Sequence, residues 1–159
     1  MTRAAWRETW MGVAILLGQR SPCVRAQVGA VIVTVDNKVD STSYNGPISG
    51  LELEGTCDQW CERAITGDTS PDYSRCQTIH AEANALIRAN HERIQGGTIY
   101  VSTSPCLNCA KQIGNSGLAC VIYRDTGDDE YRRPREMENL LHDAGLVVIR
   151  CAYQPRTVG

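Results

Sequence analysis

Two short stretches of the sequence combine metal-binding residue types with a carboxylate. The first is His80-Ala81-Glu82, and the second is Pro105-Cys106-Leu107-Asn108-Cys109. Each is expected where a strand or loop passes into a helix. Two cysteines separated by two residues at a helix start turn both sulfurs toward one point, and the helix dipole favours the thiolates that bind zinc. Since His80 can supply a third ligand, the pattern predicts a catalytic zinc whose fourth tetrahedral position is open to water.

The open position predicts hydrolytic chemistry. Bound zinc lowers the pKa of a water molecule to about 7, so hydroxide is available at neutral pH to attack an amidine-like ring carbon. Glu82 is placed to take a proton from the water and to deliver it to the ring nitrogen and the departing ammonia. A His-x-Glu motif followed by Pro-Cys-x-x-Cys is typical of zinc deaminases that act on cytosine or adenine. A lone Cys-x-x-Cys could instead be a redox pair or half of a structural zinc site.

The elements that position these residues follow from periodicity and turn residues. Helices are expected at residues 2–18, with Thr2 as the cap, and at 81–90, 107–116 and 135–144; strands are expected at 27–34, 38–44, 97–102, 119–124 and 146–151. The turn Asn45-Gly46-Pro47 ends the second strand, and residues 46–78 form a long irregular excursion. Helices that alternate with short buried strands imply an α/β fold with helices on both faces of one sheet.

The composition bounds the class of protein. Hydrophobic residues make up 42% of the 159 residues and charged residues 21%, as in ordinary globular chains, so we expect one catalytic domain over residues 1–159. The longest strongly apolar run, residues 13–17, is too short to span a bilayer, and the first residues do not form a signal peptide. We therefore expect a cytoplasmic protein with no membrane partner. In a reducing cytoplasm the eight cysteines favour metal ligation over disulfides.

Four blocks of the sequence resemble those of the deoxycytidylate deaminase family, in the order and approximate spacing of that family. They are Gln27-Val28-Gly29-Ala30-Val31-Ile32-Val33, Tyr44-Asn45-Gly46, His80-Ala81-Glu82-Ala83-Asn84-Ala85 and Ser104-Pro105-Cys106-Leu107-Asn108-Cys109-Ala110-Lys111. The resemblance implies a three-layer α-β-α cytidine deaminase-like fold with one mixed sheet of about five strands. It also implies conversion of dCMP to dUMP and ammonia, which feeds thymidylate synthesis, and a homo-oligomer, commonly a hexamer.

The same resemblance assigns roles around the site. The backbone amide of Ala81 would meet the pyrimidine carbonyl, and Asn45 and Asn84 would help to hold the base and the sugar. Many relatives are regulated by dCTP and dTTP, so Mg²⁺ bound with an allosteric nucleotide is a further expected cofactor.

The other cysteines suggest a second metal. Four of them flank or lie in the excursion, namely Cys23, Cys57, Cys61 and Cys76. A structural zinc on these thiolates would explain how a long loop with few apolar residues stays folded, because such a site contributes folding free energy directly. Some deoxycytidylate deaminases resemble this chain in carrying such a second zinc. The alternative is that some of the four are small buried residues. Cys120 and Cys151 lie in apolar strands and are expected in the core.

Other side chains are candidates for holding the nucleotide. Four arginines near the site could pair with its phosphate, Arg20, Arg25, Arg88 and Arg93, and we favour Arg25. Tyr131 and Tyr123 could stack on the base, although tyrosines beside strands are more often core or rim residues. His91 and His142 are expected at the surface or in packing, with a place near the phosphate open to His91.

Two rival functions stay open. The first is deamination of another cytosine nucleotide, a nucleoside, or a base in tRNA or single-stranded DNA. The formal net charge of −2 disfavours long nucleic acid, although a local patch of Arg132, Arg133 and Arg135 could face a phosphate. The second is a catalytically dead, zinc-stabilised binding module, and the intact Glu82 argues against it.

Overall fold

Five strands form one mixed sheet in the order β2-β1-β5-β6-β7. The computed structural model describes residues 3–70, 72–127 and 132–153. The strands of the sheet are β1 (Gly29–Val33), β2 (Val39–Tyr44), β5 (Thr98–Val101), β6 (Cys120–Arg124) and β7 (Val147–Cys151). Strand β1 is antiparallel to both β2 and β5, whereas β5, β6 and β7 run parallel to one another. The expected mixed sheet of five strands is therefore confirmed.

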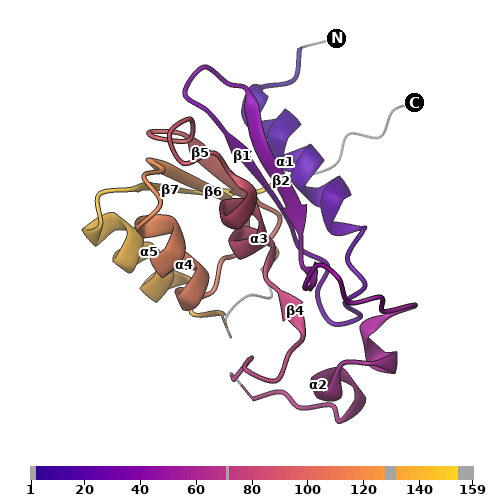
Figure 1. Ribbon diagram of the computed structural model, residues 1–159. Helices are drawn as coiled ribbons and strands as arrows, with labels where there is room; N and C mark the ends of the chain where they lie inside the picture. Colours follow the sequence, from indigo (N-terminus) through magenta and orange to yellow (C-terminus); the bar gives the residue numbers. More distant parts are fainter. Residues whose placement is uncertain (1–2, 71, 128–131, 154–159) are drawn as a thin grey trace.

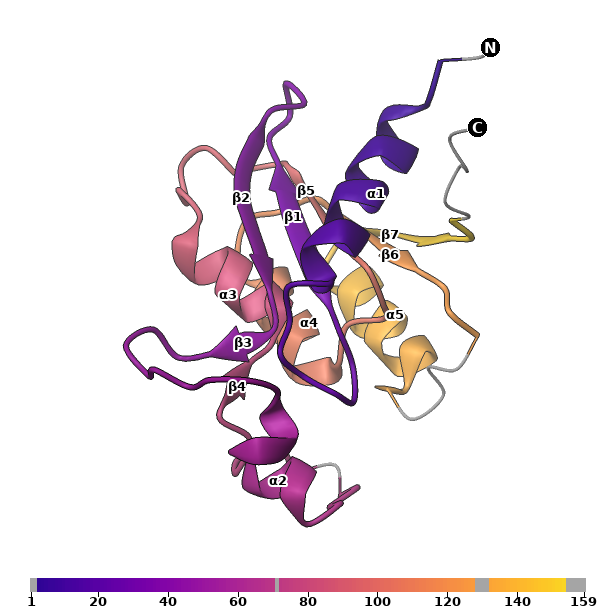
Figure 2. The ribbon, with the colours of Figure 1, turned by 90° about the vertical axis from the view of Figure 1, so that its right-hand side faces the viewer.

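Helices cover both faces of this sheet (Figures 1 and 2). Helix α1 (Trp6–Gly18) packs on one face, and the helices on the other face are α3 (Ala81–Arg88), α4 (Leu107–Gly114) and α5 (Pro134–Asp143). All five residues of β1 are buried, because Val31 and Val33 enter the core beneath α1 while Ala30 and Ile32 enter the core beneath the other helices. The sheet and its two helical layers confirm the predicted three-layer α/β fold.

Helix α1 approaches strand β1 most closely at Gly29. A Cβ atom at this position would lie 1.9 Å from the carbonyl oxygen of Ala14 and 2.6 Å from the amide nitrogen of Gly18. Only a residue without a side chain fits there. Gly29 also exchanges two hydrogen bonds with Ser102, one from its amide to the Ser102 hydroxyl at 2.9 Å and one from the Ser102 amide to its carbonyl at 3.0 Å.

Residues 46–70 and 72–78 form an inserted lobe that extends from the lower end of the sheet (Figure 2). The lobe is closed at its base by a two-stranded antiparallel pair, β3 (Gly46–Pro47) and β4 (Thr78–Ile79). Between them lie a 3-10 turn, η1 (Cys57–Gln59), and a short helix, α2 (Glu62–Ile65). Beyond Gly46 the buried residues in its described part are Cys57, Cys61 and Arg63, so the lobe has almost no apolar core of its own.

The structure corrects three local predictions. Helix α1 begins at Trp6, after an extended Ala5 that makes no side-chain cap, and the predicted cap Thr2 lies outside the described residues. Gly46-Pro47 is not only a turn, because it pairs with β4. The first strand starts at Gly29 and not at Gln27, since the amide of Val28 bonds to the Asn45 side chain and not to a neighbouring strand.

None of the helices in the described ranges is long and apolar enough to cross a membrane.

Candidate active site

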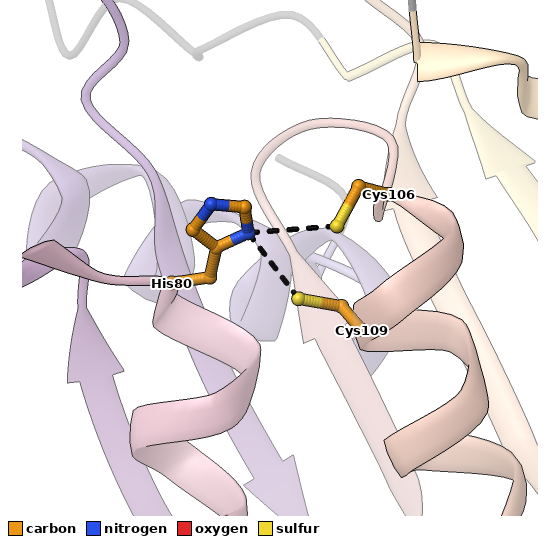
Figure 3. A group of neighbouring side chains, drawn as sticks. All are labelled: His80, Cys106 and Cys109. Atoms are coloured by element: carbon orange, nitrogen blue, oxygen red, sulfur yellow. Dashed lines mark hydrogen bonds between the residues drawn. The ribbon is translucent and has the colours of Figure 1, made fainter. Parts of the chain in front are cut away.

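Three potential metal-binding side chains converge where two helices begin (Figure 3). His80 immediately precedes α3, Cys106 immediately precedes α4, and Cys109 lies in the first turn of α4. The Nδ1 atom of His80 lies 3.5 Å from the Sγ atom of Cys106 and 3.4 Å from that of Cys109. Across residues 3–70, 72–127 and 132–153, this is the only set of three or more such side chains whose ligand atoms all lie within 4.8 Å of one another.

The electrostatics of this group suit a cation. Hydrogen bonds from the Cys109 thiol and from His80 together lower the pKa of Cys106 to about 3, against the opposing effect of burial. The pKa of Cys109 is raised, because its proton is shared with Cys106 and the residue is buried. The contact with Cys106 raises the pKa of His80. Two sulfurs and one imidazole nitrogen are the donors that Zn²⁺ takes in tetrahedral sites, so the donor set fits a zinc ion with one position left open.

Glu82 lies in the first turn of α3 and is 2% exposed. Its Oε1 atom is buried without a hydrogen-bond partner among the described residues. Burial raises the pKa of this carboxyl group, although the charge of His80 opposes the shift. A buried carboxylate oxygen without a partner is costly, and such groups concentrate where proton transfer is needed. Glu82 is therefore placed to exchange protons with a molecule bound beside His80.

A cavity of about 800 Å³ joins this group to the inserted lobe. Several residues singled out from the sequence line it: Cys23, Arg25, Asn45, Cys57, Cys61, Cys76, His80, Ala81, Glu82 and Cys106. The volume is in the range of small-molecule sites, and the lining mixes apolar side chains with a few convergent polar groups.

Asn45 and Ala81 face this cavity in different ways. The Asn45 side chain accepts a hydrogen bond from the Val28 amide and donates one to the Ala26 carbonyl, both at 2.8 Å, so it ties the cavity wall together. Ala81 is the first residue of α3, and its amide has no acceptor within the helix. Asn84 is not among the cavity-lining residues; its side-chain amide donates to the Tyr44 carbonyl at 3.1 Å.

The arginines predicted near the phosphate lie in different places. Arg25 lines the cavity and donates to the Asp68 carbonyl at 2.6 Å. Arg88 contacts Ser49, and Arg93 pairs with Asp40 at 3.5 Å, while Arg20 is exposed and does not line the cavity.

The cavity is also lined by Arg63 and Tyr73, which have no role in the sequence-based site, and by Arg132. Arg132, grouped there only with a basic patch, donates to the Ser104 carbonyl at 3.1 Å. Its position after β6 offered a signal, because the carboxyl ends of β5 and β6 lie at one edge of the sheet. Arg63 and Tyr73 lie in the lobe, where no periodicity marks them.

The remaining aromatic and histidine candidates lie away from this cavity or outside the described residues. Tyr131 lies outside the described residues. Tyr123 is a core residue, 1% exposed, whose hydroxyl donates to Glu138 at 2.6 Å, so it does not reach a base in the cavity. His91 and His142 are exposed. Cys151 is buried in the core beneath α1, as predicted, whereas Cys120 is half-buried against that core.

The four cysteines of the second group also face the cavity, as two pairs. Cys61 and Cys76 have their sulfurs 4.0 Å apart. Burial, together with the neighbouring thiols of Cys23 and Cys61, raises the pKa of Cys57 to about 11. The four thiols are thus neighbours, but their sulfurs are more widely spaced than the ligand atoms around His80.

Residues 4–124 match the family described as "Cytidine and deoxycytidylate deaminase zinc-binding region". The chain belongs to this family. Among curated relatives of this deaminase, it is 41% identical to the deoxycytidylate deaminase of Mycobacterium phage D29 over 125 residues, which is 77% of this chain and 97% of the relative. It is 34% identical to the Saccharomyces cerevisiae deoxycytidylate deaminase over 161 residues, which is 99% of this chain and 49% of the relative.

A solved structure extends the match over nearly the whole chain. The deaminase superposes on the dCMP deaminase of cyanophage S-TIM5, determined in complex with dCMP and dUMP, with a TM-score of 0.74 and 29% identity. The comparison covers 95% of this chain and all of the phage chain. The resemblance read from the sequence is therefore confirmed at the level of family and fold.

Proposed function

We propose that this deaminase hydrolyses dCMP to dUMP and ammonia and thereby feeds thymidylate synthesis. The observation that carries the proposal is the convergence of His80, Cys106 and Cys109 beside the buried, unpartnered carboxylate oxygen of Glu82. The deoxycytidylate deaminases of phage and yeast, and the phage structure with dCMP and dUMP, indicate the substrate class.

His80, Cys106 and Cys109 would hold the catalytic zinc. When bound, zinc supplies a Lewis acid that makes water reactive near neutral pH. The start of α4 stabilises the thiolates, because unpaired backbone amides gather at the N-terminal end of a helix. Burial of Cys109 keeps bulk water away from the donor set.

Glu82 would move the protons of the reaction. Its carboxylate would accept one proton from the attacking water and pass it to the ring nitrogen. It would then take the second proton, from the hydroxyl group added to the ring carbon, and pass it to the departing amine. The base gains an oxygen from water and loses its amino group as ammonia. Burial raises the pKa of Glu82, which favours its return of protons as the protonated acid.

Ala81, Asn45 and Asn84 would orient the nucleotide. The free amide of Ala81 at the start of α3 donates to the pyrimidine carbonyl, a contact that places the base beside Glu82. Asn45 lines the cavity. Its second side-chain N–H can donate to the base or the sugar while its other hydrogen bonds, to Val28 and Ala26, are kept. For Asn84 the role rests on the family resemblance, because its amide contacts Tyr44.

Arg25 would bind the phosphate. Its guanidinium group is exposed at the cavity, and its contact with the Asp68 carbonyl leaves other donors available. Stacking of Tyr131 on the base stays a prediction. Replacement of Arg25 by Met should raise KM for dCMP and leave that for deoxycytidine unchanged.

A structural zinc on Cys23, Cys57, Cys61 and Cys76 would staple the inserted lobe. The support is that these four cysteines line the cavity and that the lobe has almost no apolar core. A contraction of the two thiol pairs around one ion would satisfy four buried or half-buried sulfurs at once. Mg²⁺ would enter only with a regulatory nucleotide, whose phosphate oxygens it prefers.

The whole chain would act as one catalytic domain, in the cytoplasm, as a homo-oligomer. Eight free thiols suit a reducing compartment. The support for a homo-oligomer is the family resemblance. Light scattering on the purified protein measures the number of chains, and a hexamer is the expected result from the family.

The substrate is tested by measuring ammonia release from dCMP, dCTP, deoxycytidine and a cytosine-containing single-stranded oligonucleotide. We expect the highest kcat/KM with dCMP. A higher value with deoxycytidine or the oligonucleotide would favour the rival deaminase activities, and absence of release from all four would favour a binding module.

A further inference from the structure

The imidazole of His80 is contacted by an aromatic ring from the inserted lobe. The rings of Tyr73 and His80 are nearly perpendicular, at 86°, with their centroids 5.2 Å apart. This is the edge-to-face arrangement that aromatic pairs favour. Both rings line the cavity that holds Glu82, so the contact lies at the site itself.

This contact is notable because, within the described ranges, the second ring nitrogen of His80 lacks the hydrogen bond that metal-binding histidines usually make. A metal-binding histidine nearly always donates its second ring N–H to a carboxylate, a carbonyl or water, which fixes the ring. The Nδ1 atom of His80 faces the two sulfurs. No side chain or carbonyl of the described residues forms a hydrogen bond with Nε2. Within that part of the chain, Tyr73 is the aromatic residue that contacts the imidazole, and such a contact can restrict rotation of the ring.

Tyr73 is itself held by a buried arginine. The guanidinium carbon of Arg63 lies 4.2 Å from the centroid of the Tyr73 ring. Arg63 is 4% exposed, although arginine is seldom buried, and it donates to the carbonyls of Ser70 and Asp72 on the segment that leads to Tyr73. The planar fork of arginine can bind two carbonyls and still offer its face to a ring, which a lysine cannot do.

We propose that Tyr73 is the positioning residue for His80 and that Arg63 holds Tyr73 in place. The proposal rests on the proposed function, because it assigns His80 to the metal. It gives the inserted lobe a role in catalysis: the lobe carries the ring that keeps one metal ligand in its productive orientation. Tyr73 itself transfers no proton and acts only through His80.

Tyr73 variants test the first link. Tyr73→Leu removes the aromatic ring, whereas Tyr73→Phe keeps it and removes only the hydroxyl group. We expect Tyr73→Leu to lower kcat for dCMP by about tenfold with KM unchanged, and to speed zinc transfer to a chromogenic chelator by a similar factor. Tyr73→Phe should restore both values. The His80→Ala variant identifies which phase of zinc release belongs to this centre.

Arg63 variants test the second link. Arg63→Lys keeps the charge and loses the planar fork, so it should reproduce the faster zinc release of Tyr73→Leu. Arg75→Lys is the matched control, because Arg75 lies in the same lobe, is exposed and pairs with Glu62. It should leave kcat and zinc release at wild-type values. Circular dichroism and thermal unfolding of each variant show whether the lobe still folds.

Three results would overturn the proposal. Unchanged kcat and zinc release in Tyr73→Leu would remove the role of the ring. Equal impairment of Tyr73→Phe and Tyr73→Leu would assign the effect to the hydroxyl group. A higher KM with normal kcat and zinc release would make Tyr73 a contact for the nucleotide and not for His80. If wild-type protein fails to deaminate dCMP, the proposed function fails, yet the comparison of zinc release still decides the role of Tyr73.

Discussion

The Sγ atom of Cys106 lies 3.5 Å from the Nδ1 atom of His80, although the two residues are 26 positions apart. Both residues immediately precede a helix, and the two helices begin side by side on one face of the sheet. The helix starts thus bring together donors that are distant in sequence. This juxtaposition depends on strand β5, which connects the two helices through the middle of the sheet.

Loss of one sulfur should remove the metal and the activity together. Cys106→Ser is expected to retain one zinc fewer per chain than wild type and to release no ammonia from dCMP, because the hydroxyl group is a poor substitute for a thiolate. Atomic absorption on protein purified without chelator measures the zinc. Cys120→Ala, a change against the core beneath α1, should keep the full metal content. Retention of all zinc by Cys106→Ser would refute the ligand assignment.

Glu82→Gln should separate metal binding from catalysis. The amide keeps the shape of the side chain but cannot take a proton, so we expect kcat to fall by about 10² to 10⁴ with zinc retained. The thermal unfolding midpoint should stay level or rise, because a buried carboxyl group with an unpartnered oxygen is replaced by a neutral one. Glu62→Gln, an exposed change in the lobe, is the control. A variant that keeps more than a tenth of the activity would show that another group moves the protons.

Cys57→Ser should lower the zinc content from two to one per chain and loosen the lobe. The lobe buries little besides Cys57, Cys61 and Arg63, so the metal would supply most of its stability. Limited proteolysis should cut within residues 46–78 in the variant sooner than in wild type. One zinc per wild-type chain, with Cys23, Cys57, Cys61 and Cys76 all alkylated by iodoacetamide, would contradict a second metal site.

Glu138→Gln should reduce stability in a pH-dependent way. Arg150 donates to Glu138 at 2.7 and 3.1 Å and lowers the pKa of the carboxyl group, and Tyr123 adds a third hydrogen bond. A group whose folded-state pKa lies below its unfolded value near about 4.3 stabilises the fold above that pH. This stabilisation is lost as pH falls through the lowered folded-state pKa.

The difference in unfolding free energy between wild type and Glu138→Gln should therefore be about 1 kcal/mol at neutral pH and shrink below about pH 4. Urea unfolding at several pH values measures it. Glu136→Gln, on the same helix and 52% exposed, should change stability by less than about 0.5 kcal/mol. A difference that does not depend on pH would show that the Glu138 carboxylate charge is unimportant.

Asn45→Ala should destabilise the protein by about 1–3 kcal/mol, because it leaves the buried Val28 amide and the Ala26 carbonyl without their partner. Asn45→Asp keeps the acceptor for Val28 and should recover part of the loss. Urea unfolding at neutral pH compares the two variants. If Asn45→Ala lowers activity while stability is unchanged, the residue binds the nucleotide and does not stabilise the cavity wall.

Local patterns in the sequence predicted the residues that converge. The spacing of Cys106 and Cys109 at a helix start fixes their relative direction, and the β-branched run around Val31 predicts a strand buried on both faces. Both depend on neighbours in the chain. The cap at Thr2 was a weaker signal, because many helices begin without a side-chain cap.

Contacts made by the lobe could not be predicted in this way. Arg63 contacts Tyr73 within a segment that has no hydrophobic periodicity, and Tyr73 contacts His80 where both residues line the cavity. Gly46-Pro47 has the composition of a turn, and its pairing with β4 depends on how the lobe returns to the sheet. Such pairings are set by the path of the loop, which composition alone does not determine.

Because Gly29 has no side chain, it couples the position of helix α1 to a metal-binding site that the helix does not contact. Gly29 lets the helix rest directly on β1, and the same residue fixes Ser102, from which the chain continues to Cys106. A single added methyl group there would clash with α1. Either the helix or the strand that leads to the sulfur donors would be displaced. The residues tolerated at position 29 should therefore be limited by the geometry of the distant metal-binding site and not by contacts at the nearby surface.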